Sequence, residues 1–586
     1  MSVRPLPAKF SVCVAAALLG LPAVAPYAQV HQHGHAAHEE HSSHSGHSHH
    51  SHFRYHDPAA IPFPTLAAAL NSGSPYLLPV VGRSLPSLGD EGDISVSDER
   101  RLGDRIARSI YRDPQYLDDP QLSQYLQALW QPLMAAAKAR GDVSPDLAER
   151  FAWELMVSSD RSVNAFALPG GYLGVHLGLI ATVSNPSELA SVLAHELSHV
   201  SQRHIARLVG QQGRQTPLMI AAMVLGALAA SASRNADIAS AAIAGGQAVA
   251  VQSQLNFSRD MEREADRIGF GIMTEAGFDG VGFVTMFDKL QQASRLSDDG
   301  SFPYLRSHPL TSERMADMRA RVPLDSAELQ QRSALGAPGR QALVSDEWHA
   351  MMAARARVLS ETGIDRLRAL ALQGRQSNGP QRAASDVTAV GVRYAAALAA
   401  MQLRDADLAE QSLRALWASG LSAPDAQAAA RWLTLETMTA LPALRSTDLG
   451  GGWSALQQAA LASGTRAGLL VGARAALASG PESVRAASER LRSWTALQPT
   501  DALAWQTLSS LYQAQNLPAR AARADAEARL AYRDAPGALD RFKAAQSMAR
   551  RDPSADHFEL SILDARVRQV EQQVREEERE LRESGG

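Results

Sequence analysis

The spacing of apolar residues along the chain predicts a mainly helical protein. Around residues 97–111 and 121–137, apolar side chains recur every three to four positions, which places them on one face of a helix. The second segment shows this spacing with Leu122, Leu126, Leu129 and Leu133. We expect both helices to pack around a third, largely apolar helix that contains residues 191–200.

A small β-sheet is predicted ahead of that third helix. Residues 151–157 alternate between apolar and polar side chains like a strand. Residues 165–168 and 172–175 flank the turn sequence Pro169-Gly170-Gly171, so they should form the two strands of a hairpin.

The second half of the chain shows almost no strand signal and predicts stacked helices. Its clearest unit resembles a tetratricopeptide repeat, in which small residues let two helices approach and large residues fill the space between them. The residues at the repeat positions are Trp505, Leu508, Ser509, Tyr512, Ala521 and Ala528. Residues 394–417 and 431–444 look like degenerate units, so we expect about four repeats in a solenoid that offers a protein-binding surface.

The length of 586 residues exceeds what one hydrophobic core usually organises, so we expect separate domains. The patterns predict a mixed helix-and-sheet domain at residues 94–330 and an all-α repeat domain at 345–555. A charged helix at 556–586 carries a heptad seam and either packs on the repeats or pairs between chains. The seam consists of Leu560, Leu563, Val567, Val570 and Val574.

The N-terminal residues predict export. Two basic residues precede an apolar stretch at 10–25 that is too short to span a bilayer comfortably, so residues 1–28 are expected to be a signal peptide, with a retained anchor as the alternative. The single cysteine, Cys13, lies in this segment, and no disulfide is expected in the mature chain.

Three further segments have unusual compositions. Residues 29–57 are rich in histidine and are expected to be a disordered segment that captures metal ions or serves as a solubilising linker. Residues 58–93 should be a linker to the folded part. The apolar run at 217–232 is short for a membrane span, so we expect a helical hairpin over the active site or plain core packing, with peripheral membrane contact as an alternative.

The third helix carries the sequence His195-Glu196-Leu197-Ser198-His199, an HExxH pattern. On a helix its two histidines lie one turn apart on one face and can both bind a zinc ion, while Glu196 can take a proton from a water beside the metal. This pattern predicts peptide hydrolysis with one Zn²⁺ per chain.

The two histidines leave a zinc site in need of a third protein ligand. The beginning of another predicted helix, at residues 257–266, offers one. Glu262 and Asp266 are spaced four residues apart, so both carboxylates lie on one helix face. We expect Glu262 to be the third zinc ligand and Asp266 to accept a hydrogen bond from a ligand histidine. A solvated acidic face is the alternative for this cluster taken alone.

These two motifs, HExxH followed by ExxxD, resemble the zinc peptidases that include the CAAX prenyl protease and its soluble bacterial relatives. The resemblance covers about residues 85–325 and continues more loosely through the helical half. It also rests on residues 164–172, Glu188-Leu189-Ala190, Arg203-His204, and Ser307-His308-Pro309-Leu310 with Arg314. It implies a zincin-like α+β peptidase domain.

His308 and Arg314 are further catalytic candidates. The resemblance places the His308-Pro309 loop near the zinc, where His308 could be a fourth ligand that blocks the resting enzyme or, swung away, could stabilise the oxyanion. Arg314 is a candidate for the same electrostatic role, with surface pairing to Glu313 as the alternative.

An exposed edge strand in such an enzyme commonly binds the substrate main chain as an added strand. We therefore take Asn164, Ala165 and Phe166 as substrate-binding candidates. Ordinary turn chemistry is the alternative for Asn164.

Together these features predict a periplasmic zinc endopeptidase. The resemblance implies that it degrades unfolded or stalled outer-membrane β-barrel proteins, assists their assembly and contacts the outer-membrane assembly machinery. The net charge of −4 predicts no nucleic-acid partner. The alternatives are a chaperone-like repeat scaffold with a largely latent protease, and a metal-buffering protein suggested by the histidine-rich segment.

Overall fold

The computed structural model describes residues 94–211, 259–296, 302–322, 343–376, 386–551 and 557–584. The predicted signal peptide, histidine-rich segment and linker lie outside these residues. So does the apolar run at 217–232.

The predicted small sheet is present in the described part of the chain, in the order β1-β3-β2. Strands β2 and β3 pair antiparallel, which confirms the hairpin, whereas β1 runs parallel to β3. Gly174 in β3 faces Phe166 of β2, and a Cβ atom at this glycine would lie 2.1 Å from the phenyl ring. The strands are β1 (Glu154–Ser158), β2 (Ala165–Leu168) and β3 (Tyr172–His176), with a 3₁₀ turn η1 (Pro169–Gly171) in the hairpin.

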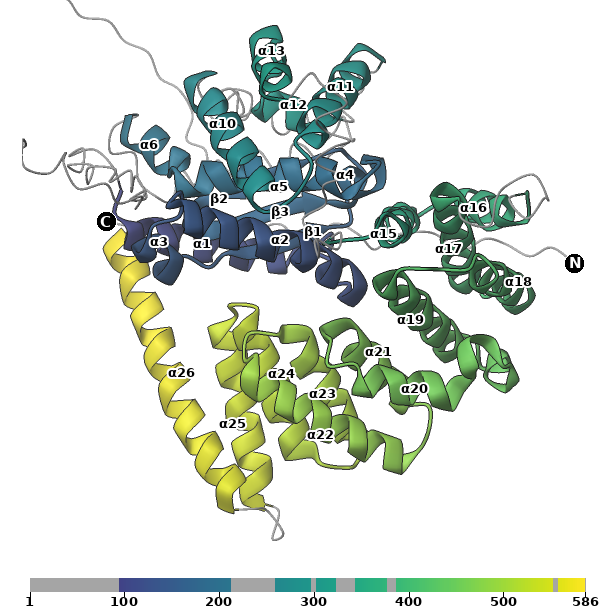
Figure 1. The fold of residues 1–586 in the computed structure, drawn as a ribbon. Helices are drawn as coiled ribbons and strands as arrows, with labels where there is room; N and C mark the ends of the chain where they lie inside the picture. The colour runs from purple at the N-terminus through teal and green to yellow at the C-terminus, as the bar shows by residue number, and fades with distance from the viewer. Residues whose placement is uncertain are drawn as a thin grey trace, which may run out of the picture. The chain divides into compact units, whose positions relative to one another are not determined.

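The helix that carries HExxH is α5 (Pro186–Ser201), and it lies in the core of the first half. Pro186 stands in its first turn, and the Asn185 side chain accepts a hydrogen bond from the Glu188 amide at 3.0 Å, which caps the helix. α5 packs against β2, α2, α10 and α11 (Figure 1). The other helices before it are α1 (Val96–Tyr111), α2 (Pro120–Arg140), α3 (Pro145–Arg150) and α4 (Leu177–Thr182), and α6 (His204–Gln211) follows it.

A second group of helices brings the ExxxD motif to α5. Gly269 of α10 makes this approach possible, because a Cβ atom there would lie 3.0 Å from the His195 amide nitrogen and 3.1 Å from the Ala194 carbonyl. The helices of this group are α10 (Arg259–Glu275), α11 (Val281–Leu296), α12 (Tyr304–Ser307) and α13 (Ser312–Arg321).

The described residues from 343 onward are helical apart from turns, as the sequence predicts. The residues of the clearest predicted repeat unit lie on α23 and α24, which pack against each other and bury Trp505, Leu508 and Ala521. The helices are α15 (Asp346–Leu359), α16 (Ile364–Gln376), α17 (Val387–Gln402), α18 (Ala406–Trp417), α19 (Pro424–Ala440), α20 (Trp453–Ala462), α21 (Arg466–Ala476), α22 (Pro481–Leu497), α23 (Ala502–Ala514), α24 (Pro518–Ala531), α25 (Ala535–Arg551) and α26 (His557–Ser584), with 3₁₀ turns η2 (Pro442–Ser446) and η3 (Leu449–Gly451).

The first helices of this all-α region share a hydrophobic core with the preceding part. α15 packs against α4 and α2, and one cluster of buried apolar residues runs from Leu122 to Ala475. Arg355 of α15 is buried and forms salt bridges with Asp119, at the start of α2, and Glu436 of α19. The predicted boundary near residues 330–345 therefore does not separate two hydrophobic cores.

The charged C-terminal helix α26 packs on α25 rather than standing apart. Leu563, Val567 and Val570 of its heptad seam are buried in a cluster with Phe542. In the described part of the chain, no helix combines the length and the apolar character needed to cross a bilayer.

Candidate metal centre

The two histidines of α5 point their Nε2 atoms toward the same place. His195 and His199 stand one helical turn apart, and their Nε2 atoms are 3.0 Å from each other. Both rings are buried. This arrangement follows directly from the four-residue spacing on a helix.

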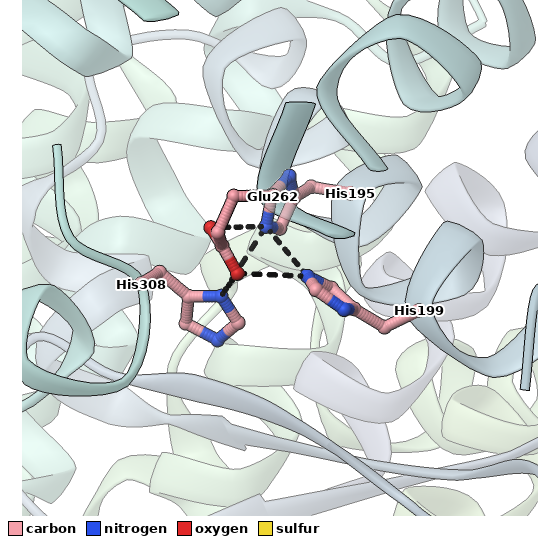
Figure 2. Close-up of side chains that lie close together, drawn as sticks. All are labelled: His195, His199, Glu262 and His308. Carbon is pink, nitrogen blue, oxygen red and sulfur yellow. Dashed lines mark hydrogen bonds and ion pairs between the residues drawn. The ribbon is translucent and has the colours of Figure 1, made fainter. Parts of the chain in front are cut away.

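Glu262 and His308 complete the cluster from two other segments (Figure 2). Glu262 Oε1 lies 3.4 Å from His199 Nε2, and Oε2 lies 3.6 Å from His195 Nε2. His308 follows α12 and places Nδ1 3.0 Å from Glu262 Oε1 and 3.3 Å from His195 Nε2. One nitrogen or oxygen of each of these four buried residues lies within 4.8 Å of the others.

Asp266 and Arg314 support this cluster. Asp266 Oδ1 is 2.9 Å from His195 Nδ1, a distance that allows the predicted role of orienting this histidine. Arg314 is buried and grips Asp266 with two hydrogen bonds of 2.6 and 2.7 Å. Its Nη1 atom also lies 2.7 Å from Glu262 Oε2, while Glu313 pairs with Arg263 instead. The guanidinium therefore holds both carboxylates in place.

Contacts on the far side of His199 were not foreseen from the sequence. His204, the first residue of α6, is fully buried and places Nδ1 2.8 Å from His199 Nδ1. Its Nε2 atom lies 3.1 Å from Glu264, which Arg207 also contacts at 3.0 Å. The sequence does contain one signal for these contacts. Glu264 lies between Glu262 and Asp266, so on a helix it points away from the face that those two share, and in the structure it faces α6.

Tyr304 is another neighbour that the motifs did not indicate. Its ring stacks on His308 with centroids 4.6 Å apart and an interplanar angle of 27°. The His308 amide donates to the Tyr304 carbonyl at 2.9 Å, so one turn of α12 fixes the histidine from two sides.

Glu196 is buried beside this cluster, and its carboxylate can still accept hydrogen bonds. Neither oxygen has a hydrogen-bond partner among the described residues, and Oε1 lies 3.5 Å from His308 Nε2. A buried carboxylate without a hydrogen bond is costly. Its position therefore suits a base that receives a proton from a small polar molecule.

The charges of the cluster shift the pKa values of its members. Burial lowers the pKa of His195, but the carboxylates of Asp266 and Glu262 outweigh burial and raise it to about 9. Burial places the pKa of His199 well below its ordinary value. Burial works to raise the pKa of Glu262, but His308, His195 and His199 hold it well below its usual range.

This donor set fits a divalent cation. Glu196, Glu262 and Asp266 are buried carboxylates with Arg314 as the buried guanidinium among them, which leaves an excess of two negative charges when the histidines are neutral. Imidazole nitrogens with one carboxylate are ligands that zinc prefers. The carboxylates that favour a proton on His195 equally favour a cation at its Nε2 atom.

The three substrate-binding candidates lie at the edge strand β2 or just before it. The Asn164 carbonyl accepts a hydrogen bond from the His176 amide at 3.0 Å, and its side chain is buried. Ala165 is fully buried, and Phe166 packs over Gly174. β2 is one of the two edge strands of the sheet and packs against α5, and a role in binding substrate remains a prediction for these residues.

Comparison with known proteins shows which family this part of the chain is similar to. Residues 120–322 match peptidase family M48. The chain is 35% identical over 254 residues to the putative beta-barrel assembly-enhancing protease of Vibrio cholerae, which covers 43% of this chain and 49% of the relative. It is 33% identical over 263 residues to the beta-barrel assembly-enhancing protease of Escherichia coli K12, covering 44% and 51%.

A more distant similarity reaches a mitochondrial enzyme. The chain is 31% identical over 168 residues to the mitochondrial metalloendopeptidase OMA1 of Arabidopsis thaliana, which covers 28% of this chain and 31% of that protein. The chain spans about half the length of the bacterial relatives it matches. These similarities confirm the resemblance that the HExxH and ExxxD motifs indicate.

Proposed function

Because residues 120–322 match peptidase family M48, we propose that this protein is a zinc-dependent endopeptidase with its active site at His195, Glu196, His199 and Glu262. The observation that carries the proposal is the position of Glu196. Its carboxylate is buried and has no hydrogen-bond partner among the described residues, and it lies next to a cluster whose donors and charge suit zinc.

Each residue has a distinct task in this proposal. His195, His199 and Glu262 would hold the zinc, which when bound supplies a Lewis acid that polarises the peptide carbonyl and the attacking water. Glu196 takes the proton of that water and passes it to the leaving amine. Asp266 and Arg314 keep His195 and Glu262 in their orientations. β2 would bind the substrate main chain as an added strand.

His308 has two possible roles, and we favour a resting block. Its ring lies between the ligand Glu262 and the base Glu196, at 3.0 Å and 3.5 Å. In this position it takes the space that a substrate carbonyl needs. Swung away from the cluster, the same ring could instead donate to the oxyanion.

We further propose that the enzyme works in the periplasm on unfolded or stalled outer-membrane β-barrel proteins and assists their assembly. The names of the bacterial relatives support this substrate class, and the apolar stretch at residues 10–25 supports export. The helices from α15 onward would act as tetratricopeptide-like repeats that hold the client or the assembly machinery near the zinc. A chaperone-like scaffold with a largely latent protease is the alternative.

The test of the enzymatic proposal is Glu196→Gln in the full chain. The amide cannot accept the proton, so cleavage of an unfolded protein should fall by about 10²–10⁴-fold while the variant still binds one zinc. Glu275→Gln, at an exposed position of α10, is the matched control and should change neither property.

Cleavage by Glu196→Gln at the wild-type rate, with contaminating proteases excluded, would contradict the proposal. The inactive variant also serves as a trap. In the native host, proteins that it retains and the wild type releases should be outer-membrane β-barrel proteins. Retention of other proteins only would contradict the substrate class.

A further inference from the structure

We propose that His204 is a positioning residue that fixes the ring and the tautomer of His199, with Glu264 as its anchor. The inference rests on the proposed zinc site, because it concerns how one of the ligands is oriented. It assigns a role to a buried histidine outside both motifs and to Glu264, which occupies one of the unspecified positions of the ExxxD motif.

The chain turns sharply to bring His204 beneath His199. Arg203, between α5 and α6, has a positive φ of 52°, which interrupts the helical backbone between the two helices. Its side chain holds this turn by donating to Glu99 at 2.8 Å and to the Ile94 carbonyl. The rings of His199 and His204 then meet edge to face, with centroids 4.9 Å apart.

The contacts admit a consistent placement of protons. A neutral imidazole has one N–H group and one lone pair. If the lone pair of His199 Nε2 faces the ligand cluster, its Nδ1 atom carries the proton and donates to His204 Nδ1 at 2.8 Å. His204 then carries its own proton on Nε2 and donates to Glu264 Oε2 at 3.1 Å.

Arg207 closes the chain of hydrogen bonds. Its Nη1 atom donates to the same Glu264 oxygen at 3.0 Å. Each hydrogen in this series therefore meets an acceptor, and the lone pair of His199 is left pointing at Glu262 and His195. The reverse direction would need a proton on Glu264 and would aim the N–H of His199 into the cluster.

Residues of α10 thus orient both zinc-binding histidines, one by a direct contact and the other through an intervening side chain. Asp266 of α10 contacts His195 directly, whereas Glu264 of α10 reaches His199 through His204. Partners of this kind typically change metal affinity by about 10–100-fold when they are removed.

The experiment measures zinc affinity of the purified full chain by competition with a chelator, and the absorption spectrum after Co²⁺ substitution. His204→Leu removes the acceptor for His199, so zinc affinity should fall by about 10–100-fold and the Co²⁺ spectrum should change. His204→Asn places an amide oxygen near the former Nδ1 position and should recover most of the affinity.

A matched control separates positioning from stability. His349 is also buried, with contacts to Tyr125 at 2.5 Å and to the Val183 carbonyl at 3.2 Å, but it lies on α15 away from the cluster. His349→Leu should lower thermal stability and leave the zinc affinity unchanged. A merely structural role of His204 would give the same result as this control.

The outcomes distinguish the inference from the proposed function. If the wild-type protein binds no zinc, the proposed function fails. If it binds zinc and His204→Leu binds it equally well, the positioning role is wrong. Should His204→Leu not fold, Glu264→Ala tests the series from its partly exposed end. Zinc affinity should then fall several-fold, and an unchanged affinity would overturn the inference.

Discussion

His308 shows how much depends on the placement of a single side chain. It is held by stacking on Tyr304 and by its contact with Glu262, and its Nε2 atom lies 3.5 Å from Glu196 Oε1, where our proposal has it block the resting site. A residue that must leave before catalysis lowers the fraction of competent enzyme, and the apparent activity falls by that fraction.

His308→Ala should therefore raise basal proteolysis, including self-cleavage. If the open arrangement is populated at about 10%, the increase is roughly tenfold. The rate of cleavage of an unfolded protein and the zinc content measure the effect. Tyr304→Phe preserves the stacked ring and is the control. A loss of activity at unchanged zinc content would show that His308 stabilises the transition state instead.

At the scale of the elements, the decisive contact is between α5 and α10. The two helices approach so closely at Gly269 that a methyl group there would press on the backbone of His195 and Ala194. This approach sets the distance from Glu262 and Asp266 to the histidines. The metal cluster therefore depends on a residue without a side chain.

Gly269→Ala should push α10 away from α5 and weaken zinc binding, with a loss of about 1–3 kcal/mol in stability from overpacking. Gly271→Ala is the matched control, because its methyl group would meet only the end of the flexible Arg140 side chain. Both changes gain about 1 kcal/mol of helix propensity. The difference in stability and zinc affinity between the two variants therefore reports the contact between α10 and α5 alone. Equal zinc affinity in the two variants would contradict this reasoning.

At the scale of the whole molecule, the part that matches peptidase family M48 and the first helices of the all-α region are joined by buried charge. Arg355 donates to Asp119 at 2.6 and 2.8 Å and to Glu436 at 2.9 and 3.0 Å. Asp119 also caps α2 by accepting from the Leu122 amide at 2.9 Å. The same carboxylate thus serves the start of one helix and the contact with another.

Arg355→Ala leaves two carboxylates uncompensated at this contact and should destabilise the protein by about 3–5 kcal/mol. Arg366→Ala, which breaks an exposed pair with Glu361, should change stability by less than about 1 kcal/mol. Denaturant unfolding followed by tryptophan fluorescence measures both. If Arg355→Ala is no less stable than Arg366→Ala, the two parts are not coupled through this salt bridge.

The shared core also changes how the halves of the chain should be separated. We expected residues 94–330 to form a domain of their own, but α15 covers α2 and α4. A cut near residue 335 would expose that apolar surface to water. That residues 94–330 fold alone stays a prediction. That the repeats select the protein to be cleaved also stays a prediction.

The sequence alone determined the features that depend on local geometry. Helix periodicity placed His195 and His199 on one face and gave Glu262 and Asp266 a common direction, because residues four apart on a helix are neighbours whatever surrounds them. The turn at Pro169-Gly170-Gly171 predicted the hairpin because proline and glycine favour the local backbone conformations of a turn. The helical character of the second half followed from its composition and spacing.

Only the tertiary structure decided the contacts that distant residues make, even where the family resemblance had placed them near the zinc. His308 is 113 residues from His195 in the chain, and no periodicity connects them. Three further features depend likewise on how closely helices pack. They are the hydrogen bonds of Arg314 to Asp266, the contacts from His199 through His204 to Glu264, and the core shared with α15. Such packing is set by the side chains at each contact, as at Gly269, and a pattern of apolar and polar residues does not specify it.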